Sequence, residues 1–250
     1  MHISDIHYKG DHTYLERIVA SINRLAPDAV CFTGDIVENT NYLTEALNAL
    51  GRIKAPLYGV PGNHEYWSGA SFDEIGRCFG NRGGAWLMDR SVAALEGKLL
   101  IAGRSGTAIN THRAASEFAM PGRTMDWTPA PLPAPPISPG LAMTSSASGL
   151  HQENPSPAEP GVKRILLTHY PAEVDTLTEP AYDLVLSGHS HGGQVRLPWF
   201  GALIVPFGVN RYQMGTYATP SGRLHVSAGL GTFFLPVRFC CRPEITLIEL

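Results

Sequence analysis

Short apolar segments that alternate with amphipathic helical patterns dominate the first third of the chain. Apolar runs at 2–4, 29–34 and 56–62 predict buried strands, because each is short and ends in a polar or glycine-rich turn. Between the first two runs, apolar side chains recur at helical spacing and stop before Pro27; they are Leu15, Ile18, Val19, Ile22 and Leu25. Between the second and third runs the same spacing recurs in Leu43, Ala46, Leu47 and Leu50. This β-α-β-α-β order predicts parallel strands joined by right-handed crossovers.

The rest of the chain contains three more apolar runs, followed by a region of shorter β-like segments. Apolar runs at 98–103, 164–169 and 182–188 predict further buried strands. Beyond them, short β-like pieces separated by glycine and proline indicate an antiparallel or mixed arrangement. The 250 residues fit a single domain, 1–250. Within it we interpret the proline-rich segment 118–162 as a flexible surface insertion, with a lid over a functional site as the alternative.

Composition narrows the classes of function. The formal net charge is −3, and the sequence has no run of basic residues that would attract nucleic-acid phosphates. We therefore expect no nucleic-acid partner. The four cysteines have no CxxC spacing and are interpreted as reduced thiols in or near the core. Neither a membrane span nor a signal peptide is present in the sequence, which predicts a cytoplasmic location or one peripheral to the membrane. Because the first apolar run is so short, an upstream segment, a membrane anchor included, is left open.

Polar side chains that can bind metals follow the ends of the predicted strands. Along the chain they are Asp5, His7, Asp35, Asn63, His64, His169, His189 and His191. The carboxyl ends of parallel strands share one edge of an open α/β sheet, so these side chains are expected to converge. A single histidine after a strand is usually an ordinary hydrogen-bonded residue. The pair in GHSH, residues 188–191, is stronger, because side chains at i and i+2 on an extended backbone point to the same face.

This ordered set of motifs resembles the calcineurin-like metallophosphoesterases. The motifs are D-x-H at 5–7, GD at 34–35, GNHE at 62–65, the histidine of LLTHYP at 169, and GHSH at 188–191. GHSHGGQ and the C-terminal segment that begins with GLGT are similar to the branch that includes bacterial membrane-associated or cell-envelope phosphodiesterases and lipid-sugar pyrophosphatases. The resemblance covers nearly the whole chain apart from the insertion.

The resemblance implies an α/β fold of four layers, an α/β/β/α sandwich of two mixed β-sheets flanked by helices, with two divalent metal ions at its edge. It implies that Asp5, His7 and His191 bind the first ion and that Asn63, His169 and His189 bind the second. Asp35 would bridge the two ions and take part in catalysis through the bridging hydroxide, which attacks phosphorus in line. His64 would bind no metal and would assist the leaving group.

Simple electrostatics agrees with that assignment. Two divalent ions, two carboxylates and a bridging hydroxide leave a net charge of about +1, which suits an anionic phosphoryl group. Nitrogen and oxygen ligands suit manganese, iron, zinc or nickel without choosing among them. His64 is expected to act as a general acid or as a hydrogen-bond donor to the transition state. We expect Glu65 to orient a neighbouring imidazole, and Gly62 and Gly188 to let the backbone turn sharply near the ions.

Two further stretches bear on the substrate. Arg104 stands where this branch often has an aspartate-containing turn; we interpret it as a surface arginine, with a phosphate contact as the alternative. The stretch 195–212 gathers Trp199, Phe200, Leu203, Ile204, Val205 and Phe207. We interpret this stretch as a core hairpin; the alternative is an apolar rim that seats an acyl chain or touches a bilayer as a peripheral membrane contact.

The predicted function is metal-dependent hydrolysis of a phosphodiester or phosphoanhydride bond in a small or lipid-linked substrate. Alternatives within this class are a UDP-lipid-sugar pyrophosphatase, a phosphomonoesterase and a hydrolase of cyclic nucleotides, because the metals contact only the phosphoryl group and the loops select the rest. A non-catalytic scaffold with this fold is the alternative from another class. The presence of all seven ligands and His64 disfavours it. The sequence gives no indication of the oligomeric state.

Overall fold

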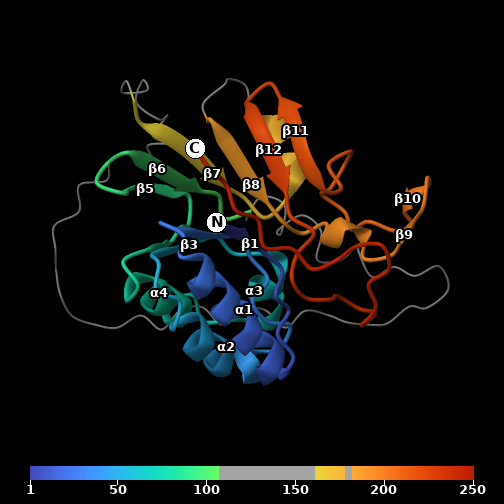
Figure 1. Cartoon of the computed structure of the whole chain (residues 1–250), viewed down its shortest axis with the longest axis horizontal. Coiled ribbons are helices and arrows are strands. Elements are labelled where there is room, and N and C mark those ends of the chain that lie inside the picture. The colour runs from blue at the N-terminus through green and yellow to red at the C-terminus, as the bar shows by residue number, and fades with distance from the viewer. Residues whose placement is uncertain (107–160, 178–181) are drawn as a thin grey trace, which may run out of the picture.

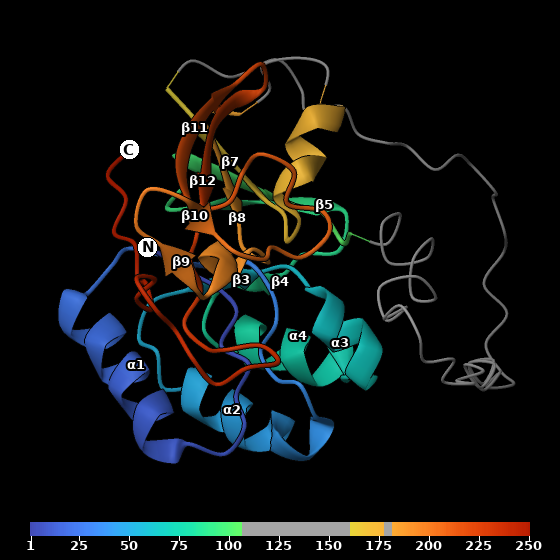
Figure 2. The same ribbon diagram turned by 90° about the vertical axis from the view of Figure 1, so that its right-hand side faces the viewer.

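The computed structural model describes residues 1–106, 161–177 and 182–250. Two β-sheets stack face to face, and helices cover the outer side of the first sheet (Figures 1 and 2). This arrangement confirms the predicted α/β class of two sheets flanked by helices. Residues 118–160 of the predicted insertion lie outside the described residues, so the insertion stays a prediction.

The first sheet contains four parallel strands in the order β1-β2-β3-β4. Their bounds are β1 His2–Ile3, β2 Val30–Phe32, β3 Leu57–Gly59 and β4 Ala85–Trp86. The helices between and beside them are α1 His12–Leu25, η1 Thr40–Tyr42, α2 Leu43–Leu50, α3 Asn63–Ser68 and α4 Phe72–Gly80. The predicted β-α-β-α-β run with parallel strands is therefore confirmed, whereas β4, α3 and α4 were not predicted.

Helix α1 shows why the sequence folds locally as it does. Its first turn is capped by Asp11, whose Oδ1 accepts a hydrogen bond from the backbone N–H of Tyr14 at 2.9 Å. The helix ends at Leu25, and the capping residue Ala26, in left-handed conformation, stands immediately before Pro27. Four of the five apolar positions predicted for this helix are buried, but Leu25 is 47% exposed because it lies in the last turn.

The second sheet has six strands in the order β11-β12-β8-β7-β6-β5. The bounds are β5 Arg90–Ala94, β6 Leu99–Gly103, β7 Lys163–Leu167, β8 Leu184–Ser187, β11 Gly215–Thr219 and β12 Gly222–Val226. The inner strands pair in parallel and the edge strands β5 and β11 pair antiparallel, so this sheet is mixed as predicted. The first sheet, which was predicted to be mixed as well, has only parallel pairs among its named strands. A separate ribbon pairs β9 (Arg196–Leu197) with β10 (Gly201–Ala202). In the described residues, the outer layer over this sheet contains the short 3-10 helix η2, Pro171–Thr176.

The hydrophobic core lies in three layers that follow the period of two along each strand. In β2, Val30 and Phe32 pack against the helices, whereas Cys31 faces the second sheet. In β7, Ile165 packs between the sheets and Leu166 faces outward. Stacking the two sheets in this way brings the carboxyl ends of β1, β2, β3, β7 and β8 to one edge of the molecule.

A buried polar chain connects the C-terminal segment to the first strand. His2 and Thr246 exchange two backbone hydrogen bonds, of 2.8 and 3.0 Å. The Nδ1 atoms of His2 and His225 are 3.1 Å apart, and His225 Nε2 is 3.3 Å from Glu244 Oε1. Burial alone would raise the pKa of Glu244, but hydrogen bonds from His225, Thr246 and the backbone lower this pKa to about 2.

We predict that Glu244→Gln destabilises the protein. A carboxylate whose folded pKa is depressed contributes stability above its unfolded pKa of 4.5, and this contribution is lost as the pH falls toward 2. We expect a loss of about 1–2 kcal/mol at pH 7 for this partly exposed group, and a difference from the unsubstituted protein that shrinks below pH 4.5. Urea unfolding at several pH values measures both effects. Identical urea midpoints for Glu244→Gln and the unsubstituted protein at pH 7 would show that the contact between His225 and Glu244 does not stabilise the fold.

Candidate metal centre

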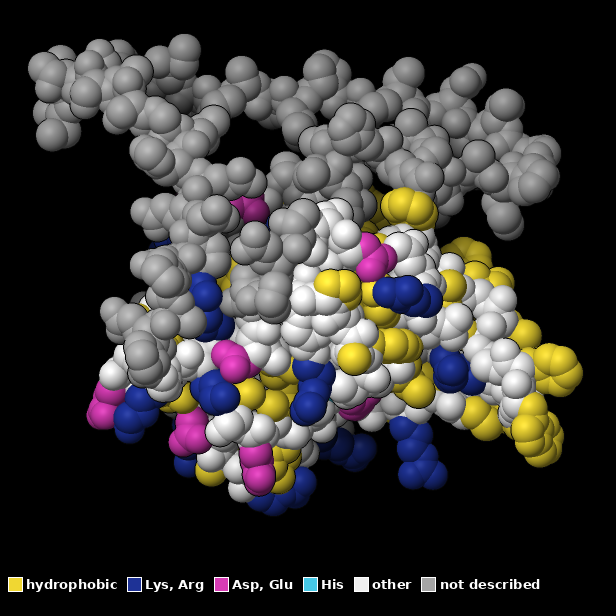
Figure 3. All heavy atoms as spheres, turned by 90° about the horizontal axis from the view of Figure 1, so that it is seen from above, with side chains coloured by type: hydrophobic (Ala, Val, Ile, Leu, Met, Phe, Trp, Pro, Cys, Tyr) yellow, Lys and Arg dark blue, Asp and Glu magenta, His cyan; other side chains and the backbone are white. Residues whose placement is uncertain are grey.

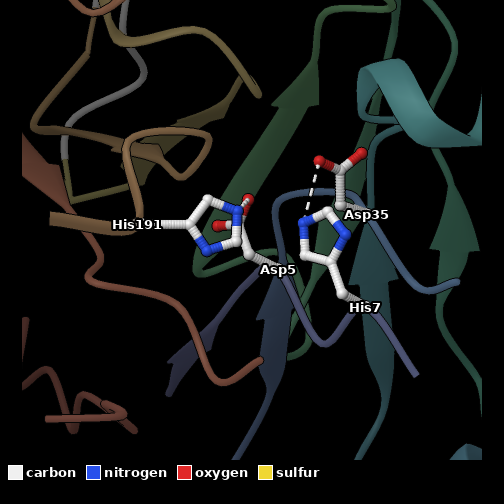
Figure 4. Close-up of side chains that lie close together, drawn as sticks. All are labelled: Asp5, His7, Asp35 and His191. Carbon is white, nitrogen blue, oxygen red and sulfur yellow. Dashed lines mark ion pairs between the residues drawn. The ribbon is translucent and has the colours of Figure 1, made fainter. Parts of the chain in front are cut away.

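The predicted ligands converge at the common edge of the two sheets. Figure 4 shows Asp5, His7, Asp35 and His191 directed toward one another from segments far apart in the chain. All of the seven predicted ligands are at most 5% exposed. They follow β1, β2, β3, β7 and β8, as the sequence predicted. Buried acids and imidazoles in such number require mutual contacts or a bound cation to offset their desolvation.

The first group of possible ligand atoms belongs to Asp5, His7, Asp35 and His191, whose atoms all lie within 4.8 Å of one another. His7 Nε2 is 3.4 Å from Asp35 Oδ2, and His191 Nε2 is 3.6 Å from Asp5 Oδ1. These separations are longer than hydrogen bonds. They match atoms that surround a common centre rather than atoms bonded directly to each other.

The second group consists of Asp35, His169 and His189, again within 4.8 Å. His169 Nε2 lies 3.3 Å from Asp35 Oδ2, 2.9 Å from Asn63 Oδ1 and 3.0 Å from His189 Nδ1. Asn63 thus joins this group, as predicted. Because Asp35 belongs to both groups, the two lie side by side and share one carboxylate.

The donor atoms of these groups fit divalent metal ions. Both ring nitrogens of His7 and the Nδ1 atom of His191 are buried and make no hydrogen bond with the described residues. Buried polar atoms normally have a partner, and an imidazole nitrogen that lacks one can bind a metal. The outer nitrogens of the other imidazoles are held by the protein: His169 Nδ1 is 2.6 Å from the Thr33 carbonyl, and His189 Nε2 is 2.6 Å from the Phe207 carbonyl.

Five of the ligands have left-handed backbone conformation. Asp5, His7, Asp35, His189 and His191 all have positive φ, between 43° and 65°. For residues with a Cβ atom this region is uncommon and costs energy, and such strain clusters at functional sites. These left-handed residues redirect the chain after β1, β2 and β8, so that the side chains point into the shared centre.

Gly62 and Gly188 are required for close approach. A Cβ atom on Gly62 would collide with the Asp35 carboxylate, and one on Gly188 would collide with Asp5 and Ser4. Neither glycine has positive φ, so the turn predicted at these positions does not require left-handed backbone at the glycines. Their function is to leave room for the two carboxylates.

The pair in GHSH converges for a different reason from the one predicted. The chain at His189 is not extended: β8 ends at Ser187, His189 has a φ of 65°, and a short 3-10 turn η3 (His191–Gly193) follows. Because of this left-handed turn, His191 joins the first group of ligands and His189 joins the second. The prediction that both side chains lie on one face of an extended strand was wrong.

Glu65 fixes the backbone of two loops instead of orienting an imidazole, which corrects the prediction. Its carboxylate accepts hydrogen bonds from the backbone N–H groups of Asp35, Ile36 and Gly62, at 2.9, 2.6 and 2.7 Å. Burial, with Asp35 nearby, raises the pKa of Glu65 to about 7, although these hydrogen bonds oppose the shift. Glu65 therefore holds the loop after β2 against the start of α3.

The carboxylates and imidazoles shift one another's pKa values. Burial lowers the pKa of the histidines, but the Asp35 carboxylate overrides it at His7 and His169, and raises both pKa values to about 9. At His189 burial and the neighbouring His169 lower the pKa to about 3. Burial would raise the pKa of Asp35, yet the surrounding imidazoles hold it well below its ordinary value. The imidazoles thus favour the ionised form of Asp35, whereas burial raises the pKa of the Asp5 carboxyl.

His64 lies beside the centre without belonging to either group. Its backbone N–H donates to Asp35 Oδ1 at 2.8 Å, and its ring centroid is 4.6 Å from that of His7 and 5.1 Å from that of Phe233. Burial lowers the pKa of its imidazole to about 4. Its ring is therefore a neutral hydrogen-bonding group at the rim of the centre.

Sequence reasoning missed two neighbours of this site. Glu38 Oε1 lies 3.4 Å from His7 Nδ1 and 2.9 Å from Lys9 Nζ, which places a second carboxylate behind that imidazole. The ring of Phe233 packs against His7, His64 and His191. Glu38 follows Asp35 by three residues, which is a weak signal, and nothing in the local sequence marks Phe233.

Arg104 donates through Nη1 to Thr176 Oγ1 at 3.0 Å.

The fold and the two buried acid and histidine groups define a metal-dependent phosphoesterase site. The model of the calcineurin-like phosphoesterase family matches residues 1–193, and the chain belongs to this family. Membership confirms the prediction of a metal-dependent phosphoesterase, for which the family implies divalent metal ions.

Three relatives describe the range of similar proteins. The metallophosphoesterase YkuE of Bacillus subtilis is 28% identical over 254 residues, which cover 100% of this chain and 76% of YkuE. The phosphodiesterase YaeI of Escherichia coli is 36% identical over 100 residues, 40% of this chain and 37% of YaeI. The UDP-2,3-diacylglucosamine pyrophosphatase LpxG of Chlamydia trachomatis is 29% identical over 288 residues, 99% of this chain and 82% of LpxG.

None of the helices in the described part of this chain has the length and apolarity needed to cross a bilayer.

We predict that Gly188→Ala weakens metal binding without unfolding the protein. The new methyl group must displace Asp5, so we expect metal affinity to fall by about tenfold or more. Metal content after dialysis, measured by mass spectrometry, tests this expectation. The matched control is Gly76→Ala in α4, where the nearest atom to the new Cβ is 3.9 Å away; it should keep its metal. Full metal retention by Gly188→Ala would show that Asp5 is not a ligand.

Proposed function

We propose that the chain hydrolyses phosphodiester or phosphoanhydride bonds with two divalent metal ions. The observation that carries this proposal is the pair of donor groups that share the Asp35 carboxylate. A single-metal site would need only one such group, and a structural site would not strain the backbone at five of its side chains. The proposal extends the family assignment to the number of ions and to the bond that is cleaved.

In this proposal every ligand has a defined place. Asp5, His7 and His191 would hold the first ion, and Asn63, His169 and His189 the second, with Asp35 between them. Bound ions of this kind supply an acidic water and neutralise charge on the phosphoryl oxygens. Imidazole nitrogens with carboxylate and amide oxygens suit manganese, iron, zinc or nickel. The four imidazoles, which are neutral when bound to a metal ion, would hold the cations without cancelling their charge.

The protein's own groups orient this chemistry. Glu65 and Gly62 fix the backbone around Asp35, and the carbonyls of Thr33 and Phe207 set the ring orientations of His169 and His189. His64 would direct an imidazole N–H toward the departing oxygen, held there by its backbone bond to Asp35. Phe233 covers one side of His7 and His64 and would limit the access of water.

The substrate is proposed to be a small or lipid-linked phosphoester. Pyrophosphate cleavage in a nucleoside-diphosphate lipid sugar is the second candidate, because the similarity to LpxG covers 99% of this chain, whereas the similarity to the phosphodiesterase YaeI covers 40%. A location in the cytoplasm or at the membrane periphery suits either candidate. A non-catalytic scaffold would not need both donor groups complete, and the test of Asp35 below separates it from an enzyme.

We predict that Asp35→Asn abolishes hydrolysis. The neutral amide cannot balance two cations, so turnover of bis(p-nitrophenyl) phosphate with added manganese should fall by about a thousandfold or more. Asp28→Asn is the control, since Asp28 is exposed in the loop before β2 and should keep full activity. If the folded, metal-loaded protein turned over no phosphate ester or pyrophosphate, the proposed function would be rejected. Undiminished activity of Asp35→Asn would reject the shared carboxylate.

We predict that the loss in His64→Gln depends on the leaving group. A group that assists departure contributes about 10²–10⁴ in rate for a poor leaving group such as an alkoxide, and much less for p-nitrophenolate. The kcat of His64→Gln on alkyl and nitrophenyl diesters, with metal content measured in parallel, tests this role. Equal losses on both substrates would indicate that His64 only maintains the structure.

A further inference from the structure

We propose that one edge of the molecule, beside the metal centre, docks onto an anionic lipid bilayer. We call it the apolar edge; it consists of the exposed apolar side chains of two loops, 197–207 and 234–239. Its most exposed members are Trp199 (99%), Phe200 (85%), Ile204 (80%) and Phe234 (75%). The others are Leu197, Leu203, Phe207, Leu235, Val237 and Phe239. Figure 3 shows hydrophobic side chains gathered at the end of the molecule where Figure 1 places β9 and β10.

This exposure excludes the core hairpin expected from the sequence. Single apolar residues on a surface are ordinary, but a contiguous group that includes a fully exposed tryptophan marks an interaction site. Tryptophan and phenylalanine at loop tips are the side chains that enter the boundary between headgroups and acyl chains. The ribbon of β9 and β10 carries Trp199 and Phe200 at its turn.

The two loops of the apolar edge are joined into one preformed surface. Arg196 N–H donates to the Phe239 carbonyl at 2.9 Å, and Phe239 N–H donates to the Gln194 carbonyl at 2.8 Å. The Gln194 side chain also bonds both the N–H and the carbonyl of Phe233, each at 2.7 Å. Because these bonds already order the loops, binding loses little conformational entropy.

Charge selects a bilayer with anionic lipids as the occupant. Residues 184–243 contain no aspartate or glutamate, although the chain as a whole carries a net charge of −3. This stretch contains five arginines, of which Arg196, Arg238 and Arg242 lie in or beside the two loops, whereas Arg223 lies in β12 and Arg211 is 3.7 Å from Asp175 Oδ1. Arg196 donates to the Gly192 carbonyl and Arg238 to the Gly231 carbonyl, and within the described residues neither has a carboxylate partner. Positive charge among exposed apolar side chains matches anionic headgroups.

The apolar edge is continuous with the metal centre. The Phe207 carbonyl contacts His189, and the Phe233 ring packs 6.4 Å from that of His191 and 5.1 Å from that of His64. Docking through the two loops would therefore hold the centre close to the headgroup region. The docking itself does not depend on the proposed hydrolysis, so it can be tested without substrate.

The test is co-sedimentation of the full chain with vesicles. We expect binding to vesicles of phosphatidylcholine with phosphatidylglycerol, and weaker binding to phosphatidylcholine alone. Trp199→Ser with Phe200→Ser should reduce the binding constant by about tenfold or more, because both side chains lose their burial. Arg242→Gln, at an exposed position, should reduce it by about fivefold on the anionic vesicles only. The control, Leu25→Ser with Leu95→Ser, removes exposed leucines elsewhere and should bind as the unsubstituted protein does.

Three outcomes would overturn the proposal. The first is failure of the folded chain to bind anionic vesicles, and the second is equal binding by the Trp199 and Phe200 double variant. The third is a dimer, seen by light scattering, that the double variant converts to a monomer while neither form binds vesicles; the apolar edge would then pair with a second copy. Thermal unfolding of each variant verifies the fold, and activity on a soluble diester remains a separate measurement that reports only on the proposed function.

Discussion

The position of the Asp35 carboxylate is the constraint on which the rest of the structure depends. Its own N–H is held by Glu65, its Oδ1 accepts from the backbone of His64, and its Oδ2 faces His7 and His169. One side chain thereby connects the ends of β1, β2, β3 and β7, which belong to both sheets. The ligands therefore come together only when the two sheets stack.

The centre is costly for the fold. Five non-glycine residues have left-handed backbone, each at a cost of about 1 kcal/mol or more, and several buried polar atoms lack hydrogen bonds. The apolar layers offset this cost, because the strands behind the centre are packed on both faces by helices or by the other sheet. Cations would relieve the remaining repulsion, so the protein is expected to gain stability when it binds metal.

Much of this organisation could be predicted from the sequence. The parallel pairing of β1, β2 and β3 and the five strands that position the ligands follow from apolar runs, and the two helices between the first three strands follow from apolar spacing. The convergence of Asp5, Asp35, His169 and their partners follows from the shared edge of parallel strands. These features depend on the spacing of apolar residues and on the order of the motifs along the chain, and both can be read from a single sequence.

Other features depend on three-dimensional packing and could not be predicted. Leu25 and Trp199 have helix-like and hairpin-like sequence contexts, yet both side chains are exposed, because within the described residues no helix or strand covers them. Glu65 follows a metal-ligand motif but bonds to backbone atoms of a loop about thirty residues away in sequence. β5 alternates exposed and partly buried residues and lacks an apolar run, so it gave no strand signal. The left-handed turn at His189 likewise has no signature in residue type.

Anomalous diffraction from crystals soaked in manganese would show whether two metal ions share the Asp35 carboxylate. We predict two anomalous peaks, one between Asp5, His7 and His191 and the other between Asn63, His169 and His189, with the Asp35 carboxylate close to both. A single peak, or two peaks that do not share Asp35, would contradict this prediction.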